Sequence, residues 1–289
     1  MTDLALAADA PIGIFDSGVG GLSVLRHIRA QLPHEHLLYF ADTGYAPYGD
    51  KPEQVVLERS LAIADFLFQR GAKALVVACN TATVAAIAIL RARHPSVPIV
   101  GVEPGLKPAA ALTRSGKVGV LATDTTLAGQ KFLRLREQIS RATSVDFLLQ
   151  GCSGLADQIE LGELHTEATL ALLRSYILPL LNQGVDTLVL GCTHYPFVLA
   201  EIERIVASNS ARAVTLVDTG EAVARQLARL LSAGNLVRAA TDQPARLEGY
   251  TSAGQAALSK AFSTLLGLNP AVSEIRLAPK TENLEQQRI

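Results

Sequence analysis

Residues Val185 to Phe197 read VDTLVLGCTHYPF. The apolar part, which ends at Leu190, is typical of a short buried strand. A polar turn follows, with Cys192 at its start and His194 two positions later. Polar groups at the carboxyl end of a buried strand are where ligands bind in open parallel sheets. This stretch therefore predicts a sheet strand with chemistry at its end.

A second stretch has the same form. Residues Ala72 to Thr83 read AKALVVACNTAT, and here too a small residue precedes the cysteine and a threonine follows it. The surrounding segments also recur, because residues 117–123 repeat the strand and polar turn of residues 11–17. Self-similarity of this kind predicts one fold unit that occurs twice.

Strands alternate with helices along the whole chain. This alternation predicts the α/β class, with two similar domains that each hold a largely parallel sheet flanked by helices. The tail, residues 279–289, is charged and expected to fray. Strands are expected at 11–15, 36–41, 72–78, 99–102, 117–122, 145–149, 185–190, 214–217 and 246–252, and helices at 22–31, 52–69, 83–94, 124–141, 166–183, 199–207, 218–232 and 254–266.

Composition excludes several classes of function. The formal net charge is −1, so the sequence carries no electrostatic sign of binding to nucleic acid or anionic membrane. Three cysteines are too few and too scattered for a secreted disulfide framework. Residues 1–10 carry no basic residue and do not resemble a secretory signal, and the longest uncharged run is short for a membrane span. We expect a cytoplasmic protein.

The two cysteines can be interpreted in two ways. A free cysteine is most often a small buried hydrophobe. However, Cys79 and Cys192 both stand at the first polar position after an apolar strand, and both are followed by hydrogen-bonding side chains. A thiol beside a helix N-terminus has its pKa lowered toward the working range. The paired context favours two reactive thiols. Cys152 lacks this context, and we expect it to be structural.

Other polar residues support this interpretation to different degrees. His194 can act as acid, base or carboxylate anchor beside Cys192. A Cys-Thr-His sequence without a second cluster of ligands is not a metal site, so no metal is expected. Asp16 and Ser17 open a glycine-rich turn that can hold an ionic group, although Asp16 could equally cap the next helix. Glu160, by its residue type alone, is expected on a solvated helix.

The glycine-rich turn also allows a second interpretation. A strand, a glycine loop, a helix, a second strand and then Asp42 imitate a dinucleotide-binding unit. Ser23 stands where the third glycine of that fingerprint belongs, and Asp16 would repel a pyrophosphate. A non-catalytic module that binds a nucleotide or an amino acid therefore remains as an alternative. The lysines offer no setting typical of a Schiff base, so pyridoxal phosphate is not indicated.

Five segments together resemble the glutamate racemases of the aspartate/glutamate racemase superfamily. The similarity extends over about residues 11–265, and the motifs occur in the family's order. They are IGIFDSGVGGL at 12–22, ADT at 41–43 with PYG at 47–49, ACNTA at 78–82, GVEP at 101–104 and LGCTHYP at 190–196.

The resemblance implies a cofactor-independent isomerase that makes D-glutamate for peptidoglycan by a two-base mechanism. The family's cysteine bases correspond to Cys79 and Cys192. Asp16, Glu160 and His194 are implied as supporting groups. The implied substrate-binding residues are Asp16, Ser17, Tyr48, Gly49, Asn80, Thr81, Thr193 and His194.

The resemblance also implies how the chain is divided. A discontinuous first domain would comprise residues 1–103 and 217–289, and a second domain residues 104–216, with a pseudo-twofold relation between them. A homodimer is the family expectation, with glutamate as the small-molecule partner. The enzymatic alternative is a racemase for aspartate or a related amino acid.

Overall fold

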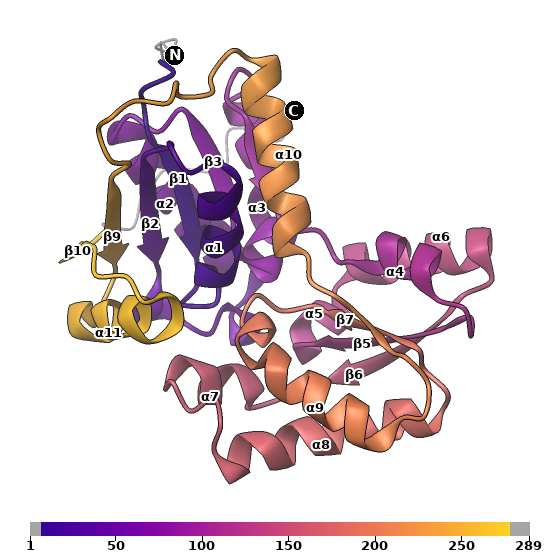
Figure 1. Cartoon of the computed structure of the whole chain (residues 1–289). Coiled ribbons are helices and arrows are strands. Elements are labelled where there is room, and N and C mark those ends of the chain that lie inside the picture. The colour runs from indigo at the N-terminus through magenta and orange to yellow at the C-terminus, as the bar shows by residue number, and fades with distance from the viewer. Residues whose placement is uncertain (1–6, 278–289) are drawn as a thin grey trace.

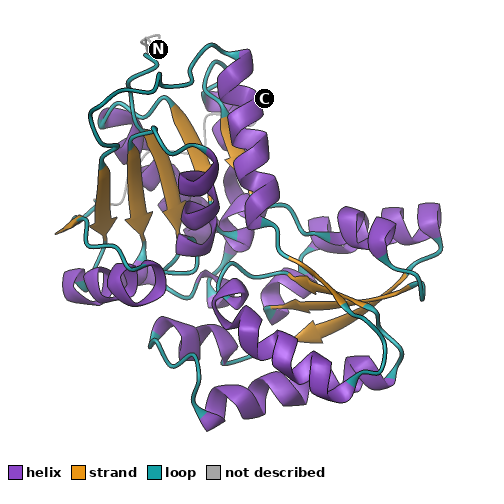
Figure 2. Ribbon diagram, in the orientation of Figure 1, coloured by secondary structure: helices purple, strands orange, loops and turns teal. Residues whose placement is uncertain are grey.

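The structure of the protein is a computed structural model that describes residues 7–277. Two parallel sheets, each covered by helices, form two domains that are visible in Figures 1 and 2. The predicted fold class is confirmed. The predicted frayed tail at 279–289 lies outside the described residues.

The larger sheet has six parallel strands in the order β10-β9-β2-β1-β3-β4. Its central strands are buried along their whole length, as expected for a parallel sheet covered on both faces. The strands are β1 (Ile12–Asp16), β2 (Leu37–Ala41), β3 (Ala74–Val77), β4 (Ile99–Gly101), β9 (Leu247–Thr251) and β10 (Ala271–Glu274).

Helices cover both faces of this sheet. Alternation along the strands assigns each side chain to a face: Ile12 and Ile14 pack on one side, and Phe15 on the other. The first side is covered by α1 (Leu22–Gln31), α10 (Gly220–Ala233) and α11 (Gln255–Leu266), and the second by α2 (Glu53–Gln69) and α3 (Asn80–Arg93).

The smaller sheet has four parallel strands in the order β6-β5-β7-β8. They are β5 (Lys117–Ala122), β6 (Asp146–Gly151), β7 (Thr187–Leu190) and β8 (Thr215–Val217). One face packs against α4 (Leu106–Leu112) and α6 (Gln130–Thr143), and the other against α7 (Leu155–Glu160), α8 (Glu167–Asn182) and α9 (Leu199–Asn209).

The two sheets share a strand order. In the larger sheet, β2-β1-β3-β4 repeats the β6-β5-β7-β8 order of the smaller one, so β3 and β7 are equivalent strands. Gly13 on β1 and Gly119 on β5 also correspond. A Cβ at Gly13 would lie 3.1 Å from Leu67 on α2, and one at Gly119 would lie 2.9 Å from Leu180 on α8. Each glycine lets the equivalent helix approach its sheet. The pseudo-twofold relation itself stays a prediction.

The chain passes between the domains twice. It leaves the larger sheet after β4 to form α4, and returns after β8 to form α10. These two crossings are in contact, because a Cβ on Gly105 would lie 3.0 Å from Val217 and 3.2 Å from Thr219. The two connections between the domains therefore lie side by side.

The helices differ from the sequence prediction in several details, and strand β10 was not predicted. The helix expected at 124–141 is divided at Gly129, whose extended ψ of 128° separates α5 (Asp124–Ala128) from α6. The cap of α5 is Thr123, one residue before the expected start. Helix α3 begins at Asn80, three residues earlier than expected, with Cys79 as its N-cap. Helix α4 was not predicted. It contains Pro108 in its first turn, where a proline is tolerated.

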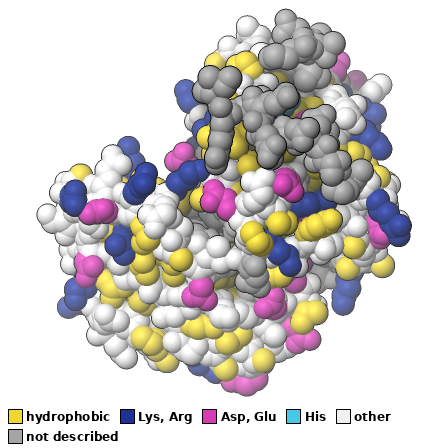
Figure 3. Space-filling model, turned by 180° about the vertical axis from the view of Figure 1, so that it is seen from behind, with side chains coloured by type: hydrophobic (Ala, Val, Ile, Leu, Met, Phe, Trp, Pro, Cys, Tyr) yellow, Lys and Arg dark blue, Asp and Glu magenta, His cyan; other side chains and the backbone are white. Residues whose placement is uncertain are grey.

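The surface carries both signs of charge. On the face shown in Figure 3, lysine and arginine side chains are interspersed with aspartate and glutamate. Within residues 7–277, no helix combines the length and apolarity that crossing a bilayer requires.

Candidate active site

A pocket lies between the carboxyl ends of the two sheets, where β1, β3, β5, β6 and β7 run out into turns. Its volume of 140 Å³ is below the range typical of drug-sized ligands and suits a small metabolite. It is lined by Asp16, Ser17, Pro47, Tyr48, Gly49, Cys79, Asn80, Thr81, Thr123, Asp124, Thr125, Thr126, Cys152, Ser153, Gly154, Ala156, Asp157, Gly191, Cys192, Thr193 and His194.

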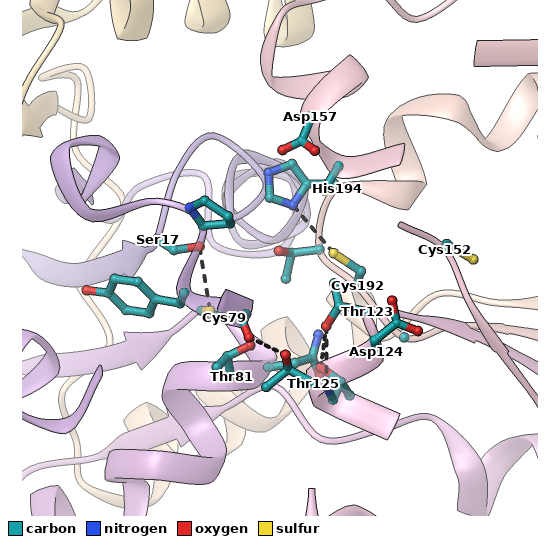
Figure 4. A pocket seen from close by; sticks show the side chains of 18 of the residues that line it. Ser17, Cys79, Thr81, Thr123, Asp124, Thr125, Cys152, Asp157, Cys192 and His194 are labelled. Carbon is teal, nitrogen blue, oxygen red and sulfur yellow. Dashed lines mark hydrogen bonds between the residues drawn. The ribbon is translucent and has the colours of Figure 1, made fainter. Parts of the chain in front are cut away.

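The structure brings both predicted thiols to this pocket. Cys79 follows β3 and Cys192 follows β7, the equivalent strand of the other sheet. Figure 4 shows them on either side of the pocket, with Ser17 beside Cys79 and His194 beside Cys192. The predicted residues of the binding turns also line the pocket. Glu160 is not part of the lining and lies behind His194, to which it is bonded.

Cys79 is held in the domain of the larger sheet. Its side chain is 5% exposed, and its Sγ lies 3.8 Å from Oγ of Ser17. The expected lowering of its pKa by the helix N-terminus is wrong. Burial raises the pKa of the Cys79 thiol far above its usual range, and the negative charge of Asp16 adds to this, so that the N–H of Ala82 cannot compensate. Burial therefore favours the neutral thiol form of Cys79.

Asp16 is fully buried at the end of β1. Its Oδ2 accepts a hydrogen bond from the N–H of Gly21 at 2.8 Å, whereas Oδ1 has no hydrogen-bond partner within residues 7–277. Burial raises the pKa of Asp16, against the opposing effect of nearby His194. A buried carboxyl oxygen without a partner costs free energy and is available to a ligand. Asp16 is therefore a candidate ligand-binding residue.

Cys192 belongs to a chain of contacts in the other domain. Its Sγ lies 3.5 Å from Nδ1 of His194, and Nε2 of His194 lies 2.6 Å from Oε1 of Glu160. Burial alone would lower the pKa of His194, but Cys192 and Glu160 together raise it well above the usual value. Burial likewise favours the neutral form of Glu160, yet His194 lowers the pKa of this carboxyl. The arrangement favours an imidazolium that can stabilise a thiolate on Cys192.

A third group of contacts fixes Tyr48. Its hydroxyl donates to Oδ2 of Asp42 at 2.6 Å, and Asp42 also receives two hydrogen bonds from Arg59, at 2.9 and 2.7 Å. Tyr45 lies against the Arg59 guanidinium, 3.8 Å from ring centroid to Cζ. Asp42 corresponds in the sequence to the acidic residue of a dinucleotide site. Its carboxylate is instead hydrogen-bonded to Tyr48 and Arg59.

The pocket offers hydrogen-bond donors to an anion without a lysine or arginine side chain. Among the described residues, no lysine or arginine lines it. The available donors are hydroxyl and amide side chains, such as Ser17, Asn80 and Thr193, together with the first N–H groups of α3, which have no acceptor within the helix. A helix N-terminus of this kind is a ready anion site. The pocket therefore fits a carboxylate.

Sequence reasoning missed a large part of the smaller domain's wall. Thr123, Thr125 and Asp157 line the pocket from the segments after β5 and β6, where Thr125 belongs to α5 and Asp157 to α7. The recurrence of residues 11–17 at 117–123 placed Thr123 at a strand end and was the one signal available. Cys152 also lines the pocket, but it is buried, its Sγ lies 3.5 Å from the carbonyl of Gln150, and burial raises its pKa to about 12.

The dinucleotide alternative is not supported by the surroundings of the glycine turn, residues Ser17–Gly21. A Cβ at Gly18 would lie 2.0 Å from Oε1 of Glu160, and one at Gly20 would lie 2.4 Å from Nδ1 of His194. The space that a pyrophosphate would need is filled by the other domain. Within residues 7–277, no group of three His, Cys, Asp or Glu side chains is arranged to hold a metal ion.

Comparison with known proteins agrees with this geometry. The model of the Asp/Glu/Hydantoin racemase family matches residues 12–227. A glutamate racemase from Ectopseudomonas mendocina is 52% identical over 259 residues, which cover 90% of this chain and 95% of that protein.

Solved structures give the same result. A glutamate racemase isoform from Bacillus anthracis superposes with a TM-score of 0.80 at 30% identity, covering 92% of this chain and 97% of its own. The Escherichia coli glutamate racemase, solved with L-glutamate and the activator UDP-MurNAc-ala, gives 0.77 at 32% identity, covering 93% and 99%. The chain therefore belongs to the Asp/Glu/Hydantoin racemase family and, within it, to the glutamate racemases, which are isomerases.

Proposed function

We propose that this protein interconverts L- and D-glutamate, with Cys79 and Cys192 as the two bases and without a cofactor. The observation that carries the proposal is that the two thiols come from equivalent strands and approach one small pocket from opposite sides. Racemisation needs a proton removed from one face of Cα and another delivered to the opposite face. Two opposed thiols do this without turning the substrate.

The two thiols differ in their neighbours, Ser17 beside Cys79 and His194 beside Cys192, and this suggests a direction for each. With L-glutamate, a thiolate on Cys192 takes the α-proton: the C–H bond breaks, an S–H bond forms and the electron pair stays on Cα. The Cys79 thiol then gives its proton to the other face. The reverse reaction exchanges the roles. The raised pKa of Cys79 suits a proton donor, and His194 suits a neighbour of a thiolate.

The carbanion intermediate requires stabilisation of the charge on the α-carboxylate. The pocket supplies hydrogen-bond donors for this purpose. They are the backbone N–H groups at the start of α3 and the side chains of Ser17, Asn80, Thr81 and Thr193. Tyr48 and Gly49 line the same side of the pocket and would contact the rest of the substrate. The unpartnered oxygen of Asp16 is a suitable acceptor for the substrate ammonium.

We infer the wider role from the family. The product would supply D-glutamate for peptidoglycan in the cytoplasm, a compartment that keeps the three free cysteines reduced. The domain division would be 1–103 with 217–289, and 104–216, and the assembly a homodimer. Light scattering of the purified protein tests the assembly directly.

The decisive experiment follows each enantiomer in D₂O by circular dichroism and proton NMR, with no added cofactor. The unmodified protein should racemise both enantiomers. Cys79→Ser and Cys192→Ser should each abolish interconversion. The two-base proposal is wrong if either variant interconverts the enantiomers near the unmodified rate.

The same purified protein distinguishes this proposal from two alternative functions. A racemase for aspartate would act faster on aspartate than on glutamate, which chiral analysis of the products resolves. A non-catalytic amino-acid-binding module would leave both enantiomers unchanged.

A further inference from the structure

The glycine turn of one domain is pressed against the proton-transfer groups of the other. The N–H of Val19 donates to Oε1 of Glu160 at 2.9 Å, the same oxygen that lies 2.6 Å from His194. Oγ of Ser23, just after the turn, donates to the carbonyl of Thr193 at 2.7 Å. Both bonds join the domain of the larger sheet to the domain of the smaller one.

The glycines of this turn are required by the neighbouring domain rather than by their own backbone. Neither Gly18 nor Gly20 has a positive φ, so an alanine could adopt either conformation. A methyl group would nevertheless overlap the Glu160 carboxylate at Gly18, and the His194 ring and Thr193 hydroxyl at Gly20, at 2.0 to 2.7 Å. The Glu160 carboxylate and the His194 ring therefore occupy the space that a Cβ atom at Gly18 or Gly20 would fill.

The Cys79 side depends less on the other domain, which acts on it through charge, since His194 lowers the pKa of Asp16. The groups that surround Cys79, Asp16 and Ser17 among them, lie in the same domain as Cys79 itself. Separating the domains would leave these contacts intact. It would break the bond from Val19 to Glu160 and remove the surface against which the His194 ring is held.

We propose that the glycine turn is a positioning element for the Cys192 side of the reaction, which aligns Glu160 and His194 only when the two domains are closed. The alignment of the groups beside Cys192 thereby depends on closure, whereas the contacts of Cys79 within its own domain do not. This inference rests on the proposed function, since it assigns Cys192 to the L-enantiomer and Cys79 to the D-enantiomer.

Primary isotope effects can separate the two faces. At equilibrium between enantiomers the two directions have linked kcat/KM values, so rates alone cannot show which thiol is impaired. The isotope effect of a substrate deuterated at Cα can show which thiol is impaired. If transfer at Cys192 becomes limiting, the isotope effect on kcat/KM rises for α-deuterated L-glutamate, whose C–D bond Cys192 breaks. It falls for α-deuterated D-glutamate, whose C–D bond Cys79 breaks in a step that is no longer limiting.

The test uses Gly18→Ala and Gly20→Ala in the full chain. We expect kcat/KM to fall by about 100-fold, the effect of misplacing a reacting group by roughly 1 Å. The isotope effect should rise from the L-side and fall from the D-side. Gly234→Ala is the matched control, because its methyl group would meet only the Leu236 side chain and the Leu230 carbonyl, no nearer than 3.2 Å, away from the pocket. Its isotope effects should equal those of the unmodified protein.

Ser23→Ala guards against misfolding, since it removes the hydroxyl that reaches the carbonyls of Thr193 and Gly20 without adding volume. It should shift the two isotope effects in the same sense by a smaller amount. The proposal is overturned if the glycine variants lose activity with both isotope effects unchanged, if the two effects move in the opposite sense, or if kcat/KM stays within twofold. Failure of the proposed function is a separate result, namely no racemisation of glutamate by the unmodified protein.

Discussion

Oε1 of Glu160 lies 2.6 Å from Nε2 of His194, and this contact connects a half-buried carboxylate to the imidazole beside Cys192. The side chain of Glu160 is 28% exposed and that of His194 is 8% exposed, so the pair is only partly screened by solvent. The charge of Glu160 can therefore control the protonation of His194.

Glu160→Gln should shift the pH dependence of the reaction. His194 has a raised pKa, so its imidazolium persists at neutral pH and is lost as pH rises through that pKa. Removing the carboxylate lowers the pKa of His194. The falling high-pH limb of kcat/KM should move to lower pH, and activity at neutral pH should drop by about 100-fold. Glu163→Gln, at an exposed position nearby, is the control. An unmoved limb would show that Glu160 does not tune His194.

Cys192 should be the most reactive of the three thiols. It is partly exposed, whereas Cys79 and Cys152 are 5% and 2% exposed, with pKa values raised by burial. At about pH 8, iodoacetamide should modify Cys192 at least ~10-fold faster than the other two. Peptide mass spectrometry gives the rates, and glutamate should slow the reaction at Cys192. Equal rates for all three in the native protein would contradict the burial described above; equal rates are expected in denaturant.

Asp42→Asn should destabilise the protein strongly. Asp42 is fully buried and neutralises Arg59, whose side chain is 8% exposed, so the substitution leaves a buried cation without its partner. The free energy of unfolding should fall by about 3 kcal/mol in urea denaturation. Asp42→Asn combined with Arg59→Met should recover most of this loss. Glu137→Gln, in an exposed pair with Arg141, should change stability by less than about 0.5 kcal/mol.

Asp186 should stabilise the smaller domain in a pH-dependent way. Its carboxylate accepts hydrogen bonds from the Thr113 hydroxyl at 2.5 Å and from the N–H groups of Arg114 and Ser115 at 2.8 and 2.6 Å. Burial would raise the pKa of Asp186, but these donors lower it to about 2. A lowered pKa adds stability above the unfolded value, and this stability is lost as pH falls through the folded one.

The corresponding experiment is Asp186→Asn. At neutral pH the substitution should lower the free energy of unfolding by about 1–2 kcal/mol, after allowance for solvent screening. The difference between variant and unmodified protein should shrink as pH falls from about 4 to about 2. A difference that stays constant over this interval would show that the carboxylate charge is not responsible.

The sequence predicted the sheet of each domain and the strand ends at which Cys79 and Cys192 stand. These features depend on local patterns, namely apolar runs that end in small and polar residues. Contacts between segments 141 and 170 residues apart, such as Val19 with Glu160 and Ser23 with Thr193, have no local signal. The pKa of Cys79 was mispredicted for a related reason. The helix N-terminus is visible in the sequence, but the depth of burial is set by the folded structure.

The contact of Gly105 with Val217 and Thr219 has a mechanical consequence. A single connection between the domains would permit them to twist about it. Two connections that touch one another resist this twisting, so that the domains can mainly open and close. Relative motion of the domains is then restricted mainly to one angle. A single distance across the pocket mouth, for example between two spin labels, would describe how far the molecule is open.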